Sequence, residues 1–201
     1  MNKVFSLFAA FWFCVCCQPL LASEKSPARC IGNICINQHG KSPAWLLRKY
    51  GVGQVHKDAD DSELVIHCYY DARQQLWIEL EFSSSEMGKA GSRFTGLFVT
   101  TVPMCPIRFS PRKSFPDFTS EYGVKIGSIE SDIIKKMGQP KRKDDVRALE
   151  SKSAYLIDSS RYASKFGSTR FVYDENPSSL LFNFYGFENG KLVSMWFADS
   201  E

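Results

Sequence analysis

The chain has 201 residues, of which 44% are hydrophobic, 23% charged and 14% aromatic, and its formal net charge is +3. This apolar content is too high for a disordered chain, and the charge is too small for a protein dedicated to binding polyanions. We therefore expect a core large enough for one domain or two small ones, and we do not expect a nucleic-acid partner.

The first 23 residues have the pattern of a secretory signal peptide. An apolar run from Val4 to Cys17 follows Lys3, and a polar, small-residue stretch ends at Ser23. A membrane-spanning helix needs about 20 apolar residues, and this run is shorter. We expect cleavage after Ala22 or Ser23, with the mature chain in the periplasm or secreted. An uncleaved anchor is the main alternative, and lipoprotein processing fits the cysteine context less well.

Four cysteines follow the predicted signal peptide, which itself holds three of the seven in the chain. An even number in an exported chain favours disulfide bonds. A two-residue turn at positions 32 and 33 would place Cys30 opposite Cys35 in a hairpin, at a distance that a disulfide accepts. Cys68 with Cys105 then follows by subtraction. Four unpaired buried thiols are the alternative, and no metal is expected because the mature chain has no Cys-x-x-Cys.

Two short helices are predicted 87 residues apart, in residues 40–51 and 127–138. Each segment has an apolar pair, basic residues in the last turn and a final glycine, Gly51 or Gly138, that can adopt the left-handed conformation which ends a helix. Gly53 and Pro140 come soon after and oppose continuation of the helices. The shared pattern indicates a degenerate repeat.

Each predicted helix precedes strands with period-two alternation, at residues 76–82 and 96–102 in the first half and at 180–185 and 190–197 in the second. Asn189-Gly190 is a strong hairpin signal. The order predicts an α+β fold of two tandem modules, each a short helix over an antiparallel sheet meander. We expect the modules at residues 24–105 and 119–201, joined by a Pro-rich linker at 106–118.

Three short motifs stand out in the second predicted module. Lys125-Ile126-Gly127 precedes the helix, Gly138-Gln139-Pro140 follows it, and Phe187-Glu188-Asn189-Gly190-Lys191-Leu192 lies in a late strand. This combination resembles the SmpA/OmlA and β-lactamase-inhibitor-protein (BLIP-like) superfamily. The resemblance implies tandem, disulfide-containing modules that are exported and bind proteins without catalysis, while leaving the partner unspecified.

No catalytic signature is present in the sequence. The three histidines, His39, His56 and His67, lie in no metal-binding or catalytic-triad motif. We therefore expect no cofactor, no metal and no enzymatic activity. One alternative stays open, an exported enzyme in which Cys68 or Cys105 pairs with His39 or His56 from a distant part of the chain.

Aromatic side chains are the best candidates for a binding site. Strand alternation places Trp77, Tyr185 and Trp196 on faces turned away from the helices, and the repeat alignment places Trp45 at an exposed helical position. Tyr and Trp often anchor protein interfaces. The alternative is that the linker or the other module covers them.

These features together predict a non-enzymatic protein of the bacterial cell envelope that binds a protein partner through outward sheet faces. It would act as an inhibitor, an immunity factor or an envelope-assembly component, as a monomer or weak oligomer. Peripheral association with the envelope is left open.

Overall fold

The computed structural model describes residues 30–36, 43–57, 64–83, 93–146, 165–176 and 181–199. The predicted signal peptide, residues 1–23, lies outside the described residues. In the part of the chain that is described, no helix has the length and apolar character needed to cross a membrane.

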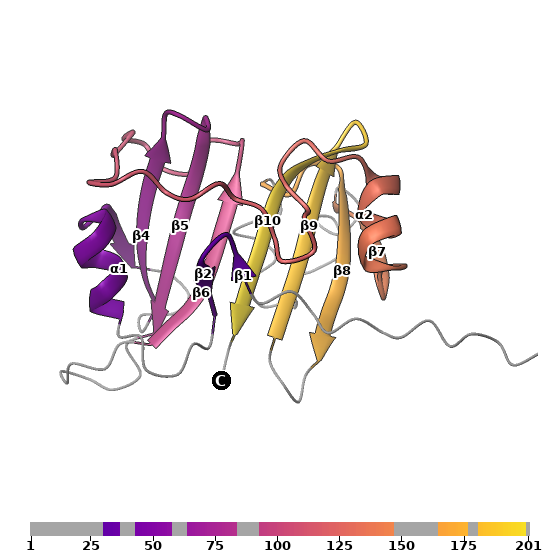
Figure 1. The fold of residues 1–201 in the computed structure, drawn as a ribbon, viewed down its shortest axis with the longest axis horizontal. Helices are drawn as coiled ribbons and strands as arrows, with labels where there is room; N and C mark the ends of the chain where they lie inside the picture. Colours follow the sequence, from indigo (N-terminus) through magenta and orange to yellow (C-terminus); the bar gives the residue numbers. More distant parts are fainter. Residues whose placement is uncertain are drawn as a thin grey trace, which may run out of the picture.

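The described chain is built around one antiparallel sheet (Figure 1). The elements are β1 (Cys30–Ile31), β2 (Ile34–Cys35), α1 (Pro43–Tyr50), β3 (Gln54–Lys57), β4 (Leu64–Asp71), β5 (Leu76–Ser83), β6 (Arg93–Thr100), α2 (Glu130–Met137), β7 (Arg142–Asp145), β8 (Thr169–Asn176), β9 (Leu181–Glu188) and β10 (Lys191–Asp199). Eight strands pair in the order β3-β4-β5-β6-β10-β9-β8-β7, and β1 with β2 forms a separate hairpin.

The predicted α+β fold of two tandem modules, each with its own sheet, is wrong. Strands from both halves of the chain join in one sheet because β6 pairs with β10, from Gly96 opposite Ala198 to Thr100 opposite Ser194. Strands dominate, and the described part has only two helices of eight residues each. Separate sheets would each expose a long strand edge with unpaired backbone groups, and the β6–β10 pairing removes both of those edges.

The local elements were predicted more successfully than the architecture. Both helices fall inside the predicted segments, and each ends at a glycine with positive φ, 85° at Gly51 and 89° at Gly138. The amide of each glycine donates to the carbonyl four residues earlier, as expected at a helix end. Asn189 and Gly190, with φ of 51° and 73°, turn β9 into β10. Positive φ at both positions suits the right-handed twist of a hairpin.

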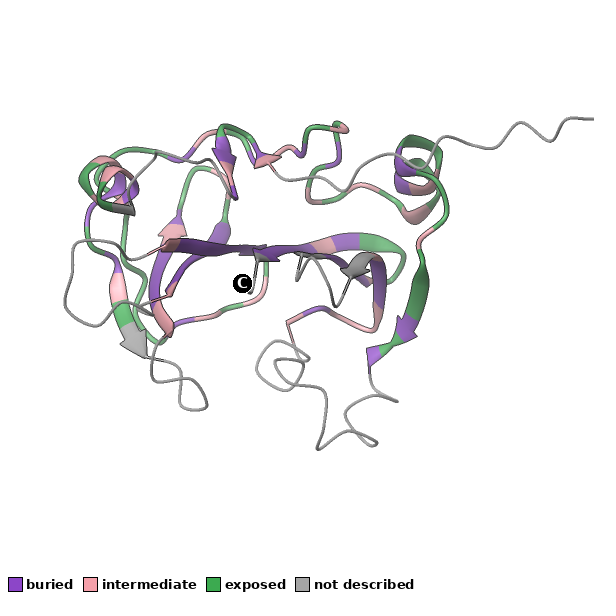
Figure 2. Ribbon diagram, turned by 90° about the horizontal axis from the view of Figure 1, so that it is seen from below, coloured by how far each residue is buried: buried purple, intermediate pink, exposed green. Residues whose placement is uncertain are grey.

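The main core lies on one face of the sheet, beneath both helices and the β1–β2 hairpin (Figure 2). It runs without interruption from Leu46 of α1 to Ile133 of α2 and includes Ile31 of the hairpin. Sheet residues from both halves contribute, among them Ile78 and Phe197, which are almost completely buried. Burial of this shared apolar surface therefore stabilises the two halves together.

The opposite face of the sheet is also covered. Phe166 lies against Phe98 and Phe184 in edge-to-face contacts at 5.4 and 5.9 Å between ring centroids, and Trp196 packs in the same cluster. At the rim of this cluster the guanidinium of Arg170 is 4.7 Å from the centre of the Phe184 ring. Both faces of the sheet are therefore packed, so a side chain that faces away from the helices can still be buried.

Residues 101–118, called the strap below, connect β6 to the second half and contact both faces of the sheet. Cys105 packs with Cys68 on the face opposite the helices, while Phe115 and Phe118 are buried in the main core. Between these points the carbonyl of Phe109 accepts a hydrogen bond of 2.9 Å from the amide of Tyr70 on β4. The segment predicted as a linker, residues 106–118, forms most of this strap.

The two disulfides differ in the length of chain that they close. The Cys30–Cys35 bond closes a loop with a sequence separation of 5, and the Cys68–Cys105 bond closes one with a separation of 37. A disulfide removes more conformational entropy from the unfolded chain when it closes a longer loop. We therefore expect that replacing Cys68 and Cys105 by Ala lowers the unfolding free energy by about 4 kcal/mol, whereas replacing Cys30 and Cys35 lowers it by about 2 kcal/mol. Urea unfolding without reductant measures both costs. A larger loss for the Cys30–Cys35 variant would contradict this order.

Asp144 forms a buried ionic cluster, accepting hydrogen bonds from Arg142 Nε at 2.7 Å and Arg170 Nη2 at 2.8 Å. Burial alone would raise the pKa of Asp144, but the hydrogen bonds and charges of Arg142 and Arg170 outweigh it and hold the pKa below its ordinary value of 3.8. The unfolded chain therefore takes up this proton at higher pH than the folded one. The stability that Asp144 contributes is present above pH 3.8 and is lost as pH falls below it.

We expect Asp144→Asn to lower the unfolding free energy by about 3–5 kcal/mol at neutral pH, because Arg170 would keep a buried charge without its counter-ion. The difference from wild type should shrink as pH falls below 3.8. Urea unfolding between neutral and acid pH measures it, with the exposed neighbour Asp145→Asn as the control. A difference that stays constant with pH would show that ionisation of Asp144 does not contribute.

Candidate binding groove at the end of the sheet

An open groove of about 830 Å³ lies at the end of the sheet where β4 turns into β5. Its walls come from the β4–β5 turn, from several parts of the strap and from the segment that follows the strap. The turn lies at the upper end of β4 and β5 in Figure 1, with the later part of the strap crossing in front of these strands. We call this site the end groove.

Two aromatic side chains form the inner wall of the end groove. Tyr70 on β4 pairs directly with Trp77 on β5, and their ring centroids are 5.0 Å apart. Trp77 is only 5% exposed because it packs against the Cys68–Cys105 disulfide. Cross-strand pairing and this disulfide therefore fix the aromatic wall.

The β4–β5 turn is held by the buried carboxylate of Asp71. Its Oδ1 accepts hydrogen bonds from the backbone amides of Arg73 at 2.9 Å and Gln74 at 3.3 Å, and its Oδ2 accepts one from Gln74 Nε2 at 2.9 Å. An Asp side chain that bonds the amide two residues later is a characteristic way to stabilise a turn. The turn thereby holds the Arg73 and Gln74 side chains toward the strap.

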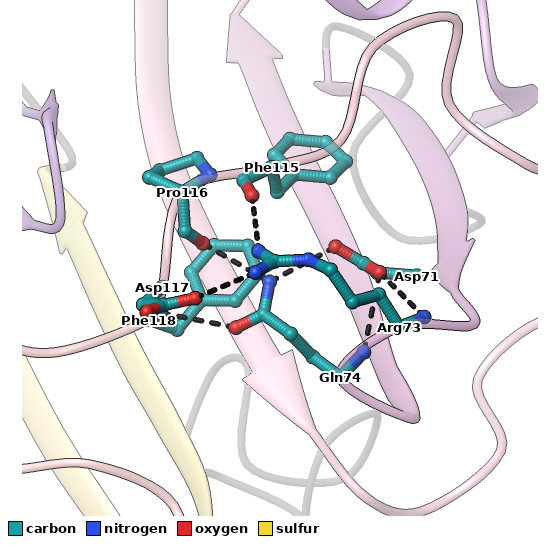
Figure 3. Close-up of polar contacts among 7 residues, drawn as sticks. All are labelled: Asp71, Arg73, Gln74, Phe115, Pro116, Asp117 and Phe118. Carbon is teal, nitrogen blue, oxygen red and sulfur yellow. Dashed lines mark hydrogen bonds and ion pairs between the residues drawn. The ribbon is translucent and has the colours of Figure 1, made fainter.

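The same two side chains fasten the strap to the turn (Figure 3). Arg73 Nη2 donates to the carbonyl of Phe115 at 2.8 Å, and Gln74 Nε2 donates to the carbonyl of Pro116 at 3.0 Å. Gln74 Oε1 accepts from the amide of Phe118 at 3.3 Å. Side chains of the turn thus satisfy these backbone groups of the strap. The same hydrogen bonds hold this wall of the groove in place.

Buried tyrosines support the strap from below. Tyr50 stacks on Phe115 with ring centroids 4.0 Å apart, and the hydroxyl of Tyr69 donates a hydrogen bond of 2.7 Å to the carbonyl of Gly51. Burial raises the pKa of Tyr50 and of Tyr69 to about 12. The Tyr69 hydroxyl thus contributes a buried hydrogen bond, whereas Tyr50 contributes packing.

The charged lining of the end groove is mainly positive. The Arg108 guanidinium lies 4.7 Å from the centre of the Tyr70 ring, and Lys125 lines another wall. Within the described part of the chain neither cation has a carboxylate partner. Asp117 also lines the groove but forms an ion pair of 3.0 Å with Arg73. The groove thus combines two cations with the aromatic rings of Tyr70, Trp77 and Phe118.

Of the four aromatic residues proposed from the sequence, only Trp77 lines this groove. Trp45 is half-buried on α1, with Lys49 Nζ 5.0 Å from its ring. The prediction that Tyr185 faces away from the helices is wrong, because its side chain lies in the main core and is 0% exposed. Trp77 and Trp196 do face away from the helices, but both are covered and only 5% exposed, which is the alternative that the sequence left open.

Tyr185 and Trp196 are buried for different physical reasons. The register of β9 turns Tyr185 toward the helices, where it lies between Tyr173 and Phe197 in the main core. Trp196 does face away from the helices, but Phe166 and Phe184 cover it. An outward position on this sheet therefore does not create a free surface.

The cysteines pair as predicted. Cys30 lies opposite Cys35 in the β1–β2 hairpin, and their Cα atoms are 4.0 Å apart. Cys68 forms the second disulfide with Cys105, and the Cα atoms of this pair are 6.5 Å apart. With both sulfurs of Cys68 and Cys105 in a disulfide, neither offers the thiolate that the Cys–His alternative requires. His39 lies outside the described residues, as does the His56 side chain.

Glu79 is the buried acidic neighbour of this disulfide, with Oε1 4.0 Å from Cys105 Sγ. The donor atoms of Cys68, Glu79 and Cys105 lie within 4.8 Å of one another, a grouping that could hold a metal ion. The disulfide uses both sulfurs, however, and a metal would need them as thiolates. The disulfide form of this cluster therefore does not fit a metal centre.

Sequence reasoning missed the groove residues Tyr70, Arg108 and Lys125. Tyr70 precedes the predicted strand at residues 76–82 and Lys125 belongs to the Lys-Ile-Gly motif, but neither position indicates a shared site. Arg108 lies in the predicted linker, where no periodicity indicates which surface it will reach. Only the path of the strap brings these side chains together.

Comparison of the chain with protein-family models, with curated proteins and with solved structures found no match. The resemblance to the SmpA/OmlA and BLIP-like superfamily stays a prediction, and the function is inferred from the site.

Substitution of Trp196 tests directly whether its side chain is buried. We expect Trp196→Ala to cost about 3–5 kcal/mol of unfolding free energy because it empties a packed cluster, whereas Trp45→Ala on the half-buried helix should cost about 1 kcal/mol. Urea unfolding followed by circular dichroism measures both. Equal and small losses would restore the view that Trp196 lies on an open face.

Proposed function

We propose that this chain is an exported, non-enzymatic protein-binding protein that holds its partner in the end groove rather than on a sheet face. The observation that carries the proposal is the lining of the groove, which the Tyr70–Trp77 pair shares with the cations Arg108 and Lys125. Tyr, Trp and Arg are the residue types that contribute most to the energy of protein interfaces.

The groove is also held in place before any partner arrives. The Cys68–Cys105 disulfide fixes one part of the strap, and the hydrogen bonds of Arg73 and Gln74 fix another. A surface that does not have to be ordered on binding loses less entropy in the complex. Such preorganisation supports a role in stable recognition.

Two observations support an exported site of action. Both disulfides form in this structure, and disulfides persist in oxidising compartments outside the cytosol. The N-terminal sequence has the pattern of a secretory signal. Within the envelope, the binding role would be that of an inhibitor, an immunity factor or an assembly component.

Site-specific photo-crosslinking tests this proposal in the exported full chain. Thr101 is exposed and lines the groove, so a benzophenone amino acid at this position should form a covalent adduct with one protein partner. The matched control is the same substitution at Lys135, which is exposed on α2 away from the groove. Gel shifts and mass spectrometry identify the adducts.

An adduct that forms at Thr101 and not at Lys135 would support the proposal. Equal adducts at both positions, or adducts at Lys135 alone, would overturn the assignment of the partner to the end groove. Adducts at neither position would contradict the binding role.

A further inference from the structure

We infer that the end groove recognises an acidic segment of the partner, in which a carboxylate side chain lies next to an apolar one. This inference rests on the proposed function and adds the chemistry of the partner. It follows from the charges, the aromatic wall and the size of the groove.

The charges favour an anionic group. Arg108 and Lys125 are both exposed, and neither has a carboxylate partner in the part of the chain that is described. Asp117, the acidic residue of the lining, forms an exposed ion pair with Arg73, which partly offsets its charge. A carboxylate entering the groove would therefore meet two cations and one acidic side chain, a balance that favours an anionic partner.

The placement of Arg108 favours a carboxylate in particular. The central carbon of its guanidinium lies over the Tyr70 ring, 4.7 Å from the ring centroid, which places the group at the aromatic wall. The N–H groups of a guanidinium can donate two parallel hydrogen bonds to a carboxylate. Lys125 adds a second positive charge without demanding a particular geometry.

The rest of the lining favours an apolar neighbour to that carboxylate. Trp77, Phe118 and Ile126 line the groove together with the charged residues. The volume of about 830 Å³ lies within the range of about 300–1,000 Å³ that is typical of ligand sites, so more than one side chain can enter. A polyanion binds by having many of its phosphates neutralised, and the two cations of the groove are too few for that. A short acidic peptide segment fits this combination best.

Peptide titration followed by amide NMR of the folded, oxidised protein tests the inference. The probes are an acetylated Glu-Leu-Glu peptide and its neutral Gln-Leu-Gln analogue, with inorganic polyphosphate and phosphatidylglycerol vesicles as competing anions. We expect the acidic peptide to shift the amides of Tyr70, Arg108 and Lys125 and to bind about tenfold more tightly than the neutral one, a difference of about 1.4 kcal/mol.

Matched variants locate the effect. Arg108→Gln and Lys125→Gln should each weaken the acidic peptide by about threefold to tenfold, and Lys135→Gln on α2 should leave it unchanged. Retention of the remaining amide spectrum shows that each variant is folded. Binding should also weaken as ionic strength rises from about 0.05 to about 0.3 M, because the cations are exposed.

Three results would overturn the inference. These are equal affinity for the acidic and neutral peptides, an effect of Lys135→Gln as large as that of Arg108→Gln, or tighter binding of polyphosphate or vesicles than of the peptide at the same amides. If crosslinking at Thr101 still captures a protein in any of these cases, the proposed function stands and only the acidic recognition fails. Loss of the crosslink as well would remove both.

Discussion

The pairing of β6 with β10 is the constraint on which the rest of the structure depends. It joins two four-stranded halves into one eight-stranded sheet, and it makes the main core continuous from α1 to α2. Because both helices lie on the same face, the apolar surface of each half is buried partly by residues of the other. The two halves are therefore expected to unfold together rather than one by one.

A continuous sheet also determines the path of the chain between its halves. The strap must leave β6 and reach α2, and it does so by contacting both sheet faces, with Cys105 on one and Phe115 on the other. Its backbone pairs with few strand groups, so the side chains of Arg73 and Gln74 satisfy several of its carbonyls and amides. The end groove exists because the strap and the β4–β5 turn are held together at this point.

The chemistry of the end groove suits binding better than catalysis. Arg108 lies over the Tyr70 ring, the cysteines of the adjacent strand and strap form a disulfide, and burial raises the pKa of Tyr50 and of Tyr69 to about 12. These features support the proposed recognition of a protein partner. They also explain why the sheet faces, which the sequence made attractive as binding surfaces, are poor candidates, since both are packed.

Local interactions let the sequence by itself determine both helices, the glycines that end them, the Asn189-Gly190 turn and the pairing of Cys30 with Cys35. Each of these depends on residues only a few positions apart. Contacts between distant segments decide the union of the halves, the burial of Tyr185 and Trp196, and the placement of Arg108 and Lys125 along one groove. Alternation along a strand predicts which side chains share a face, but only the tertiary structure decides what covers that face.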